Sequence, residues 1–237
     1  MDRYDLWKDT LLIVNTDHGF LLGEHGWWAK CVQPFYNEIA HIPLFIWDPR
    51  SRVRGERRRS LVQTIDLPAT LLEFFGLPLP PDMQGRPLRE TVERDAPSRE
   101  AALFGLFGAQ VNVTDGRYVY MRAPVRPDNT PLYEYTLMPA HMRQAFGVDE
   151  LQSVTLADPF PFTKGCRTLK IPAKKAGRPH GFTHWLFDLD ANPRQEQPIL
   201  STEIESRMIE QMIRLMKANH APPEQFERLG LGTTYTP

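Results

Sequence analysis

The chain has 237 residues, of which 41% are hydrophobic and 24% charged, and its formal net charge is −1. A chain of this length can bury a substantial core as one or two domains. The balanced charge creates no field that favours nucleic acid or a membrane surface, and no apolar stretch reaches the roughly 18–20 residues of a membrane span. Two cysteines, Cys31 and Cys166, provide no disulfide framework.

Residues 10–30 carry the strongest functional signal in the chain. The apolar run at 11–14 (LLIV) predicts a strand buried on both faces, and Asp17-His18-Gly19 follows its end. In open α/β sheets, ligands bind beyond the carboxyl ends of the strands. For the adjacent Asp17 and His18 to face one cation the chain must leave the extended conformation, and Gly19 permits that turn by tolerating a positive φ. An ordinary polar strand end is the alternative.

An oxygen donor beside a nitrogen donor suits particular metals. Asp17 and His18 together favour Mn²⁺ or Mg²⁺, and Ca²⁺ if His18 does not touch the ion. The segment at 23–30 (GEHGWWAK) places His25 and Lys30 within reach of the same strand end. A second apolar run at 42–47 (IPLFIW), stopped by Asp48-Pro49, predicts another buried strand.

The succession TDHG, GEHGxWxK and IPLFIWDP resembles the C-terminal half of the sulfatase family in the alkaline phosphatase superfamily. The resemblance implies that Asp17 and His18 bind one divalent metal ion. It also implies that Lys30 grips the sulfate or phosphate oxygens of a small anionic ester. The family's nucleophile motif, C/S-x-P-x-R, does not occur in this sequence. The formylglycine nucleophile is therefore expected in an N-terminal part outside this chain, and the chain alone is expected to be inactive.

The resemblance also implies an α/β fold class. Residues 1–97 are expected to be the C-terminal part of an alkaline-phosphatase-like sandwich, a mostly parallel sheet with flanking helices, and to carry half of the metal site. Residues 98–237 are expected to form a small subdomain in which an antiparallel sheet is covered by a helix. The stretch LFDLDANPRQE, residues 186–196, resembles the subdomain's LYDLxxDPxE signature.

Local patterns predict further elements along the chain. A helix is expected from the N-cap Asp66 to Gly76, and a hairpin over 111–121 that turns at Asp115-Gly116. A strand is expected at 183–190, and a helix with a methionine-rich buried face at 202–218, capped by Thr202. Residues 129–146 are rich in aromatic side chains and begin as a loop, and residues 158–180 read as a long loop. They form either the rim that selects the organic group of the substrate or a surface loop and a packing helix.

Ester hydrolysis needs charge stabilisation and an acid for the leaving group. Lys30 is the candidate for the first role, because it would neutralise charge that builds on the transferred group. His25 would bind the ester oxygen or the nucleophile and help to protonate the leaving group, or would be a structural residue packed near Trp27 or Trp28. Lys30 and His25 are thus the candidate catalytic and substrate-binding residues. Cys31, beside Lys30, is interpreted as a small buried side chain.

Three functions are consistent with the sequence. The first is sulfuric ester hydrolysis, in which this chain is the metal- and substrate-binding portion. The second is hydrolysis of a phosphodiester or phosphonate monoester, which His18 after Asp17 fits equally well. The third is a non-catalytic fragment that forms oligomers or binds a partner. No nucleic-acid or membrane partner is expected, an oligomer of identical chains is left open, and the absence of a signal peptide at Met1 weakly favours the cytoplasm.

Overall fold

The computed structural model describes residues 1–30, 34–138, 140–141, 144–173 and 183–232. Its helices are α1 (Asn37–Ala40), α2 (Asp66–Phe74), α3 (Arg89–Arg94), α4 (Val148–Ser153), α5 (Thr202–Ala218) and α6 (Pro223–Arg228). Its strands are β1 (Leu12–Asn15), β2 (Leu21–Leu22), β3 (Trp28–Ala29), β4 (Leu44–Trp47), β5 (Ala102–Gly105), β6 (Val111–Thr114), β7 (Tyr118–Arg122), β8 (Tyr133–Thr136), β9 (Thr155–Ala157), β10 (Thr168–Pro172) and β11 (Trp185–Asp188). Short 3₁₀ turns lie at Asp2–Tyr4, Leu6–Lys8, Glu24–Gly26 and Pro161–Thr163.

Strands β11, β7, β6 and β5 form an antiparallel sheet in that order, which we call the central sheet. The predicted hairpin is confirmed, because β6 and β7 pair across a turn at Asp115-Gly116. The turn is fixed locally: Oδ1 of Asp115 accepts from the backbone amides of Arg117 and Tyr118 at 3.0 and 2.7 Å, and Gly116 adopts a φ of 97°. Only a glycine takes such a φ at little cost, so the sequence specifies this turn.

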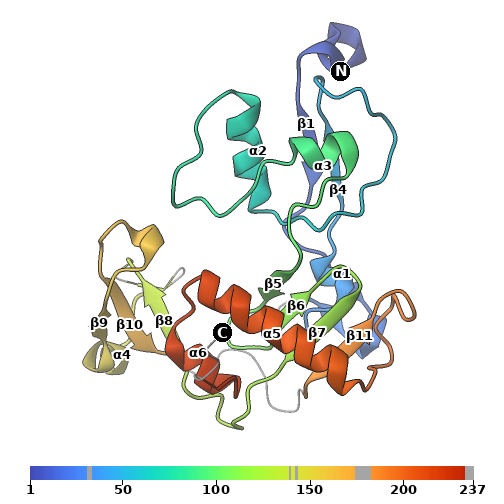
Figure 1. Ribbon diagram of the computed structural model, residues 1–237. Helices are drawn as coiled ribbons and strands as arrows, with labels where there is room; N and C mark the ends of the chain where they lie inside the picture. Colours follow the sequence, from blue (N-terminus) through green and yellow to red (C-terminus); the bar gives the residue numbers. More distant parts are fainter. Residues whose placement is uncertain (31–33, 139, 142–143, 174–182, 233–237) are drawn as a thin grey trace.

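Helix α5 covers one face of the central sheet (Figure 1). The predicted methionine face is confirmed, since Met208 and Met212 are fully buried and Met216 is nearly so, against Val113 and Tyr120. The predicted cap is displaced by one residue. The hydroxyl of Ser201, rather than that of Thr202, accepts from the backbone amide of Ile204 at 3.4 Å.

The opposite face of the central sheet packs against the segment that follows β1. Successive residues of a strand point to opposite faces, so Val119 and Met121 of β7 turn away from α5. They form a second buried cluster with Leu21, Tyr36 and Ile39. This packing anchors the loop between β1 and β4 on the central sheet and thereby positions the residues predicted to carry the chemistry.

Strands β1 and β4 pair with each other antiparallel, in a register that sets Val14 opposite Phe45. Both side chains are exposed, at 51% and 68% of their surfaces. The expectation that each strand is buried on both faces is therefore wrong for the described chain, and this pair does not belong to the parallel part of the expected sheet. An apolar run indicates only that a strand can be buried. The number and direction of the neighbouring strands depend on segments far away in the chain.

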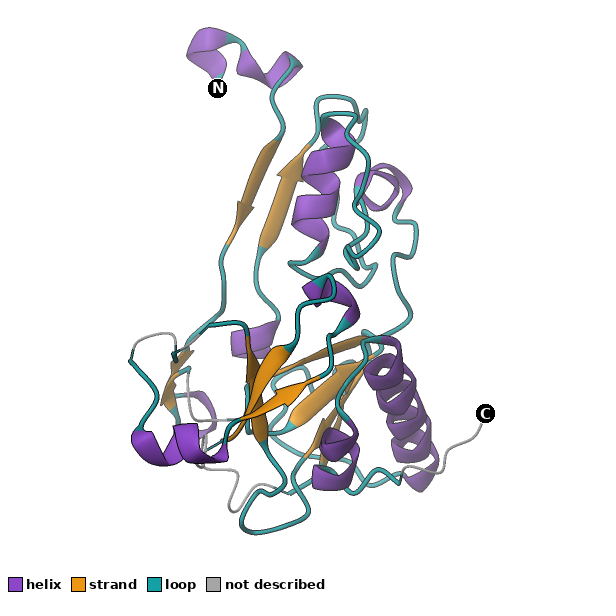
Figure 2. Cartoon of the chain, turned by 90° about the vertical axis from the view of Figure 1, so that its left-hand side faces the viewer, coloured by secondary structure: helices purple, strands orange, loops and turns teal. Residues whose placement is uncertain are grey.

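Helix α2 lies beside β4 and is tied to its end by charge (Figure 2). Arg50 binds Asp48 at 2.7 Å and Glu73 of α2 at 2.8 Å. The helix begins at Asp66, but the carboxylate of Asp66 does not cap it as predicted. It accepts from the backbone amides of Gln63 and Arg86, both outside the helix, at 2.8 and 2.9 Å.

A second antiparallel sheet, in the order β8, β10, β9, forms where no strand was predicted. Strand β8 lies within residues 129–146, and β10 within residues 158–180. The prediction of one long loop over residues 158–180 is wrong, because β10 interrupts it, and the segment that begins as a loop at residue 129 continues into β8. Residues 174–182 fall outside the described part of the chain. No described helix has the length and apolar content needed to cross a membrane. The domain boundary at residues 97–98 stays a prediction.

Candidate functional site

The chain leaves the extended conformation at Asp17, as the sequence analysis required. Oδ1 of Asp17 accepts from the backbone amide of His18 at 3.0 Å and from the hydroxyl of Thr16 at 3.3 Å. Thr16 also reaches the backbone carbonyl of His18 at 3.2 Å. These local hydrogen bonds form a compact turn directly after β1, and the turn brings the side chains of Asp17 and His18 to the same side.

Gly19 is needed for a different reason from the one predicted. It does not adopt a positive φ. Its backbone amide instead donates to the carbonyl of Ile39 in α1 at 2.9 Å, and a Cβ on Gly19 would collide with the carbonyl oxygen of Glu38. The glycine therefore allows the Asp17-His18 turn to lie directly against the backbone of α1.

The imidazole of His18 is oriented by the backbone. Its Nδ1 lies 2.9 Å from the carbonyl oxygen of Gly19, so Nδ1 carries the proton and donates it to that oxygen. In metal-binding histidines, a hydrogen bond from one ring nitrogen to a carbonyl fixes the tautomer, because it leaves the lone pair on the other nitrogen for the metal. Nε2 of His18 faces Oδ2 of Asp17 at 3.2 Å and accepts from the ammonium group of Lys30. The structure thus brings Asp17, His18 and Lys30 together.

The donor set fits half of a divalent metal site. Oδ2 of Asp17 and Nε2 of His18 lie close together. The positively charged ammonium of Lys30 is bound to Nε2 of His18, which shows that a cation can be held at this position. No cluster of three or more His, Cys, Asp or Glu side chains suited to a metal occurs among the described residues. The side chain of Asp17 is 81% exposed, so the pair is open to solvent and to further ligands.

The carboxyl of Asp17 is held ionised, as a metal ligand must be. Desolvation acts to raise its pKa, but this is outweighed by the hydrogen bonds from the hydroxyl of Thr16 and from the backbone. The pKa of Asp17 therefore lies below its ordinary value.

Lys30 is presented by a strained hairpin formed by β2 and β3. His25 has a φ of 55° and Ala29, directly before Lys30, a φ of 80°. Non-glycine residues in such conformations cost on the order of 1–3 kcal/mol each, and they concentrate at functional sites. The strain thus lies at His25 itself and directly before Lys30, the two residues of this segment that the sequence singled out.

The side chain of His25 is not joined to Asp17, His18 or Lys30 by any hydrogen bond within the described residues. It is 8% exposed and stacks on Tyr36, with the ring centroids 3.7 Å apart and the planes 9° from parallel. Its Nε2 lies 3.3 Å from Oε2 of Glu38. Burial, together with the charge of Glu38, raises the pKa of Tyr36 to about 12, so the phenol stays neutral.

Glu38 is the polar group that sequence reasoning missed. It lies in α1, whose backbone holds Gly19, and its carboxylate holds His25, so a single short helix links the two halves of the site. No spacing rule connects positions 25 and 38, because the contact depends on how the β2–β3 hairpin folds over α1. Cys31, which follows Lys30, lies outside the described residues.

Comparison with known proteins places the chain in a family. The profile of the family described as N-sulphoglucosamine sulphohydrolase, C-terminal, matches residues 23–157, a range that includes His25 and Lys30. An N-acetylglucosamine-6-O-sulfatase from Bacteroides thetaiotaomicron is 33% identical over 87 residues, which are 37% of this chain and 15% of that protein. The chain thus spans only a small part of the length of this curated relative.

Solved structures show the same fold. A protein in complex with its substrate D-glucosamine-2-N,6-O-disulfate superposes with a TM-score of 0.63 at 17% identity, over 94% of this chain and 37% of the other. A phosphonate monoester hydrolase from Silicibacter pomeroyi superposes with a TM-score of 0.56 at 18% identity, over 92% of this chain and 37% of the other. The predicted fold class and the resemblance to sulfatases are confirmed, and the chain belongs to the N-sulphoglucosamine sulphohydrolase C-terminal family of the sulfatases.

Proposed function

We propose that this chain is the metal- and substrate-binding portion of an enzyme that hydrolyses sulfate esters. The observation that supports the proposal is the convergence of Oδ2 of Asp17, Nε2 of His18 and Nζ of Lys30 at the end of β1, in a member of a sulfatase family. Since the C/S-x-P-x-R motif is missing from residues 1–237, the nucleophile would be supplied by polypeptide other than this chain.

Each residue of the cluster has a defined task in this proposal. Asp17 and His18 would hold one Ca²⁺, Mn²⁺ or Mg²⁺ ion, which when bound supplies positive charge and lowers the pKa of the nucleophile. The ammonium of Lys30 would bind a nonbridging oxygen of the sulfate and stabilise the charge that builds there. A preorganised contact of this kind contributes on the order of 3–4 kcal/mol to catalysis.

His25 and Glu38 would supply the proton for the leaving group. A carboxylate that accepts from an imidazole stabilises the protonated ring, which is the form a general acid needs. The 3.3 Å contact and the stacking on Tyr36 would hold the ring in place. Because no hydrogen bond within the described residues joins His25 to Asp17, His18 or Lys30, this role depends on a substrate that reaches both His25 and Lys30.

The substrate class is proposed from the chemistry of the site and from the relatives. The exposed carboxylate of Asp17 would repel an anionic substrate. The attraction of the substrate to Lys30 and to the metal ion must therefore exceed this repulsion. The proteins similar to this chain include an N-acetylglucosamine-6-O-sulfatase and one bound to a disulfated glucosamine. A small sulfated sugar is therefore the probe of choice.

Hydrolysis of a phosphonate monoester is the second candidate. It is favoured by the structural similarity to the hydrolase from Silicibacter pomeroyi and by the use of His18 directly after Asp17. A sulfate and a phosphonate present similar tetrahedral oxygens to Lys30, so the described residues serve either ester.

The test compares esters and variants. Chain 1–237, and any longer product of the same reading frame, is assayed with p-nitrophenyl sulfate, glucosamine 6-sulfate and p-nitrophenyl phenylphosphonate. We expect turnover only in the longer product, with Asp17→Ala and Lys30→Ala abolishing it and Lys8→Ala, an exposed lysine paired with Asp5, leaving it unchanged. Turnover that survives Lys30→Ala would refute the proposal, and a longer product without any turnover would favour a non-catalytic role. A cytoplasmic location and assembly of identical chains stay predictions.

A further inference from the structure

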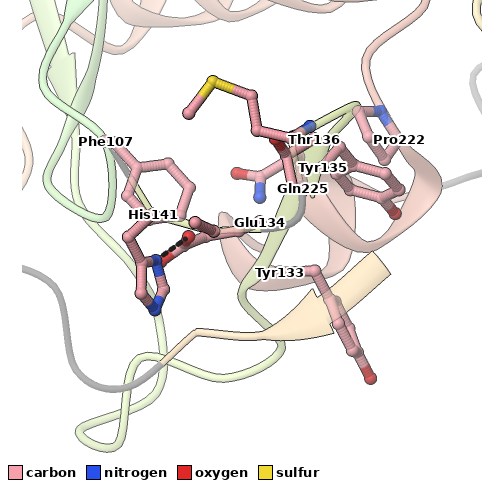
Figure 3. Close-up of a pocket in the computed structure, with 10 residues that line it drawn as sticks. Phe107, Tyr133, Glu134, Tyr135, Thr136, His141, Pro222 and Gln225 are labelled. Carbon is pink, nitrogen blue, oxygen red and sulfur yellow. Dashed lines mark hydrogen bonds and ion pairs between the residues drawn. The ribbon is translucent and has the colours of Figure 1, made fainter. Parts of the chain in front are cut away.

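A cavity of about 580 Å³ lies along strand β8, away from the candidate site. Its walls come from Phe107 in the turn between β5 and β6, from β8, and from Pro222 and Gln225 at the start of α6 (Figure 3). In Figure 1, β8 lies beyond β5, at one edge of the central sheet. The segment that carries Lys30 packs instead on β7 and β11, toward the other edge. The cavity is therefore a separate feature of the molecule.

One part of the cavity is apolar and accessible. Phe107 is 48% exposed and Met138 46% exposed, and both line the cavity together with Pro222. An accessible aromatic ring in a concave wall offers a flat surface on which a ligand with an apolar face can stack. Tyr133 and Tyr135 contribute less, because Nζ of Lys170 lies over both rings, 4.3 and 5.5 Å from their centroids.

The described ionisable side chains around the cavity form ion pairs with one another. His141 lies between Glu134 and Glu150, with Nδ1 3.0 Å and Nε2 3.1 Å from their carboxylate oxygens. An imidazole whose two nitrogens both face carboxylates must donate from both and is positively charged. On the other side, Lys170 binds Glu224 at 2.9 Å.

A third described cation near the cavity, Arg228, is buried. Arg228 is 2% exposed and donates to the backbone carbonyl of Ala109, to Asn129 and to Oε1 of Gln225. With this arginine, the groups carry three positive and three negative charges. Each of these described cations faces an acceptor within the protein, and each of these carboxylates faces a cation, so none of the six side chains offers an unopposed charge to a ligand.

Neutral hydrogen-bonding groups remain at the surface of the cavity. Because Oε1 of Gln225 accepts from Arg228 at 3.0 Å, its side-chain amide group is oriented with the NH₂ as the available donor. The second oxygen of Glu134, which does not contact His141, is an available acceptor. A donor and an acceptor beside an aromatic ring match a ligand that has hydroxyl groups on its rim and C–H groups on its face.

We propose that this cavity is a binding site for an uncharged sugar ring, which stacks on Phe107 and exchanges hydrogen bonds with Glu134 and Gln225. The site goes beyond the proposed hydrolase function, because it selects against the sulfate group that Lys30 would bind. It would hold an unsulfated sugar unit while the ester is bound elsewhere.

The experiment measures binding to chain 1–237 directly, by saturation-transfer NMR and calorimetry with methyl β-D-glucopyranoside, N-acetylglucosamine and glucose 6-sulfate. We expect a neutral sugar to bind with a Kd of about 1 mM, the sulfated sugar to bind at least about tenfold more weakly to this cavity, and Phe107→Ala to weaken binding of the neutral sugar by about tenfold or more. Phe75→Ala, which removes an exposed ring at the end of α2, is the matched control and should leave binding unchanged.

Two further variants separate this site from the anion site. Gln225→Leu removes the donor and should weaken binding of the neutral sugar, whereas Lys30→Ala should not change it. The proposal is overturned if no neutral sugar binds, if Phe107→Ala binds as tightly as the unmodified chain, or if Lys30→Ala abolishes binding. Because the measurement does not depend on turnover, failure of the proposed hydrolase activity would leave its outcome unaffected.

Discussion

Arg99 holds the carboxylate of Asp66 through two parallel hydrogen bonds, each 2.6 Å long, from its two terminal nitrogens. Asp66 is completely buried at the start of α2, and the side chain of Arg99 is 9% exposed just before β5. The pair therefore joins the part of the chain that carries α2 to the part that forms the central sheet.

Loss of this pair should be severely destabilising. Asp66→Asn leaves a buried guanidinium without its counter-charge, which typically costs about 3–5 kcal/mol of unfolding free energy. Urea unfolding of the two proteins measures the difference. Arg94→Ala is the control, because its pairing with Glu90 is on the surface and such pairs contribute about 0–1 kcal/mol. Equal losses in the two variants would show that burial does not control the strength of these pairs.

The same pair should make the fold sensitive to acid. Burial acts to raise the pKa of Asp66, but the hydrogen bonds from Arg99, Gln63 and Arg86 and the charge of Arg99 lower it overall. A depressed pKa contributes stability that is complete above the ordinary value of 3.8 and is lost as the pH falls through the folded-state value. The difference in unfolding free energy between the unmodified chain and Asp66→Asn should therefore stay constant above about pH 5 and narrow as the pH falls from about 4 toward about 2. A gap independent of pH would be inconsistent with an ionised Asp66.

His141 should have the opposite dependence on pH. Its hydrogen bond to Glu150, partly offset by desolvation, and its attraction to Glu134 raise its pKa above the ordinary value of 6.5. A raised pKa contributes stability that is complete below 6.5 and is lost as the pH rises through the folded-state value. We expect His141→Gln to lower the melting temperature at about pH 6 and to have little effect at about pH 9, with the exposed His41→Gln as control. A loss that grows with pH would contradict the assignment of a charged ring.

Gly19 should tolerate no side chain. In Gly19→Ala the new methyl group meets the carbonyl oxygen of Glu38, so α1 and the Asp17-His18 turn must separate, at a cost of about 1–3 kcal/mol. Thermal unfolding measures the loss, and the hydrogen exchange of the Gly19 amide reports whether its bond to Ile39 is broken. An unchanged melting temperature would mean that α1 can move aside without penalty.

Metal binding to chain 1–237 should be weak, because two protein ligands leave most of the coordination sphere to water. Calorimetric titration with Mn²⁺, Ca²⁺ and Mg²⁺ is expected to give Kd values of about 1 mM or weaker, and Asp17→Ala should remove the remaining signal. Tight stoichiometric binding would show that further ligands complete the site within this chain.

Local signals were sufficient to predict several elements. The Asp115-Gly116 turn and the methionine face of α5 follow from short-range rules that involve neighbouring residues only. The grouping of Asp17, His18 and Lys30 was likewise predicted, because a turn and one hairpin bring them together.

Other features depend on contacts between distant residues. The antiparallel pairing of β1 with β4 and the stacking of His25 on Tyr36 are set by packing on the central sheet. Strand β8 was missed because prolines at 131 and 139 bracket it, and prolines usually indicate loops. The aromatic and polar side chains of β8 (YEYT) do alternate, but the alternation spans only four residues, all of them partly buried.

The buried methionines of α5 affect how the protein responds to oxidants. Peroxide reaches a thioether only where it is accessible, and Met208, Met212 and Met216 are almost completely covered by the central sheet. Conversion to the polar sulfoxide would therefore require the helix to lift away, and a chain oxidised in that state would lose the apolar surface that reseats the helix. Sulfoxide at these positions therefore indicates that the helix has separated from the sheet. Mass spectrometry of the oxidised peptides can then measure how often α5 opens.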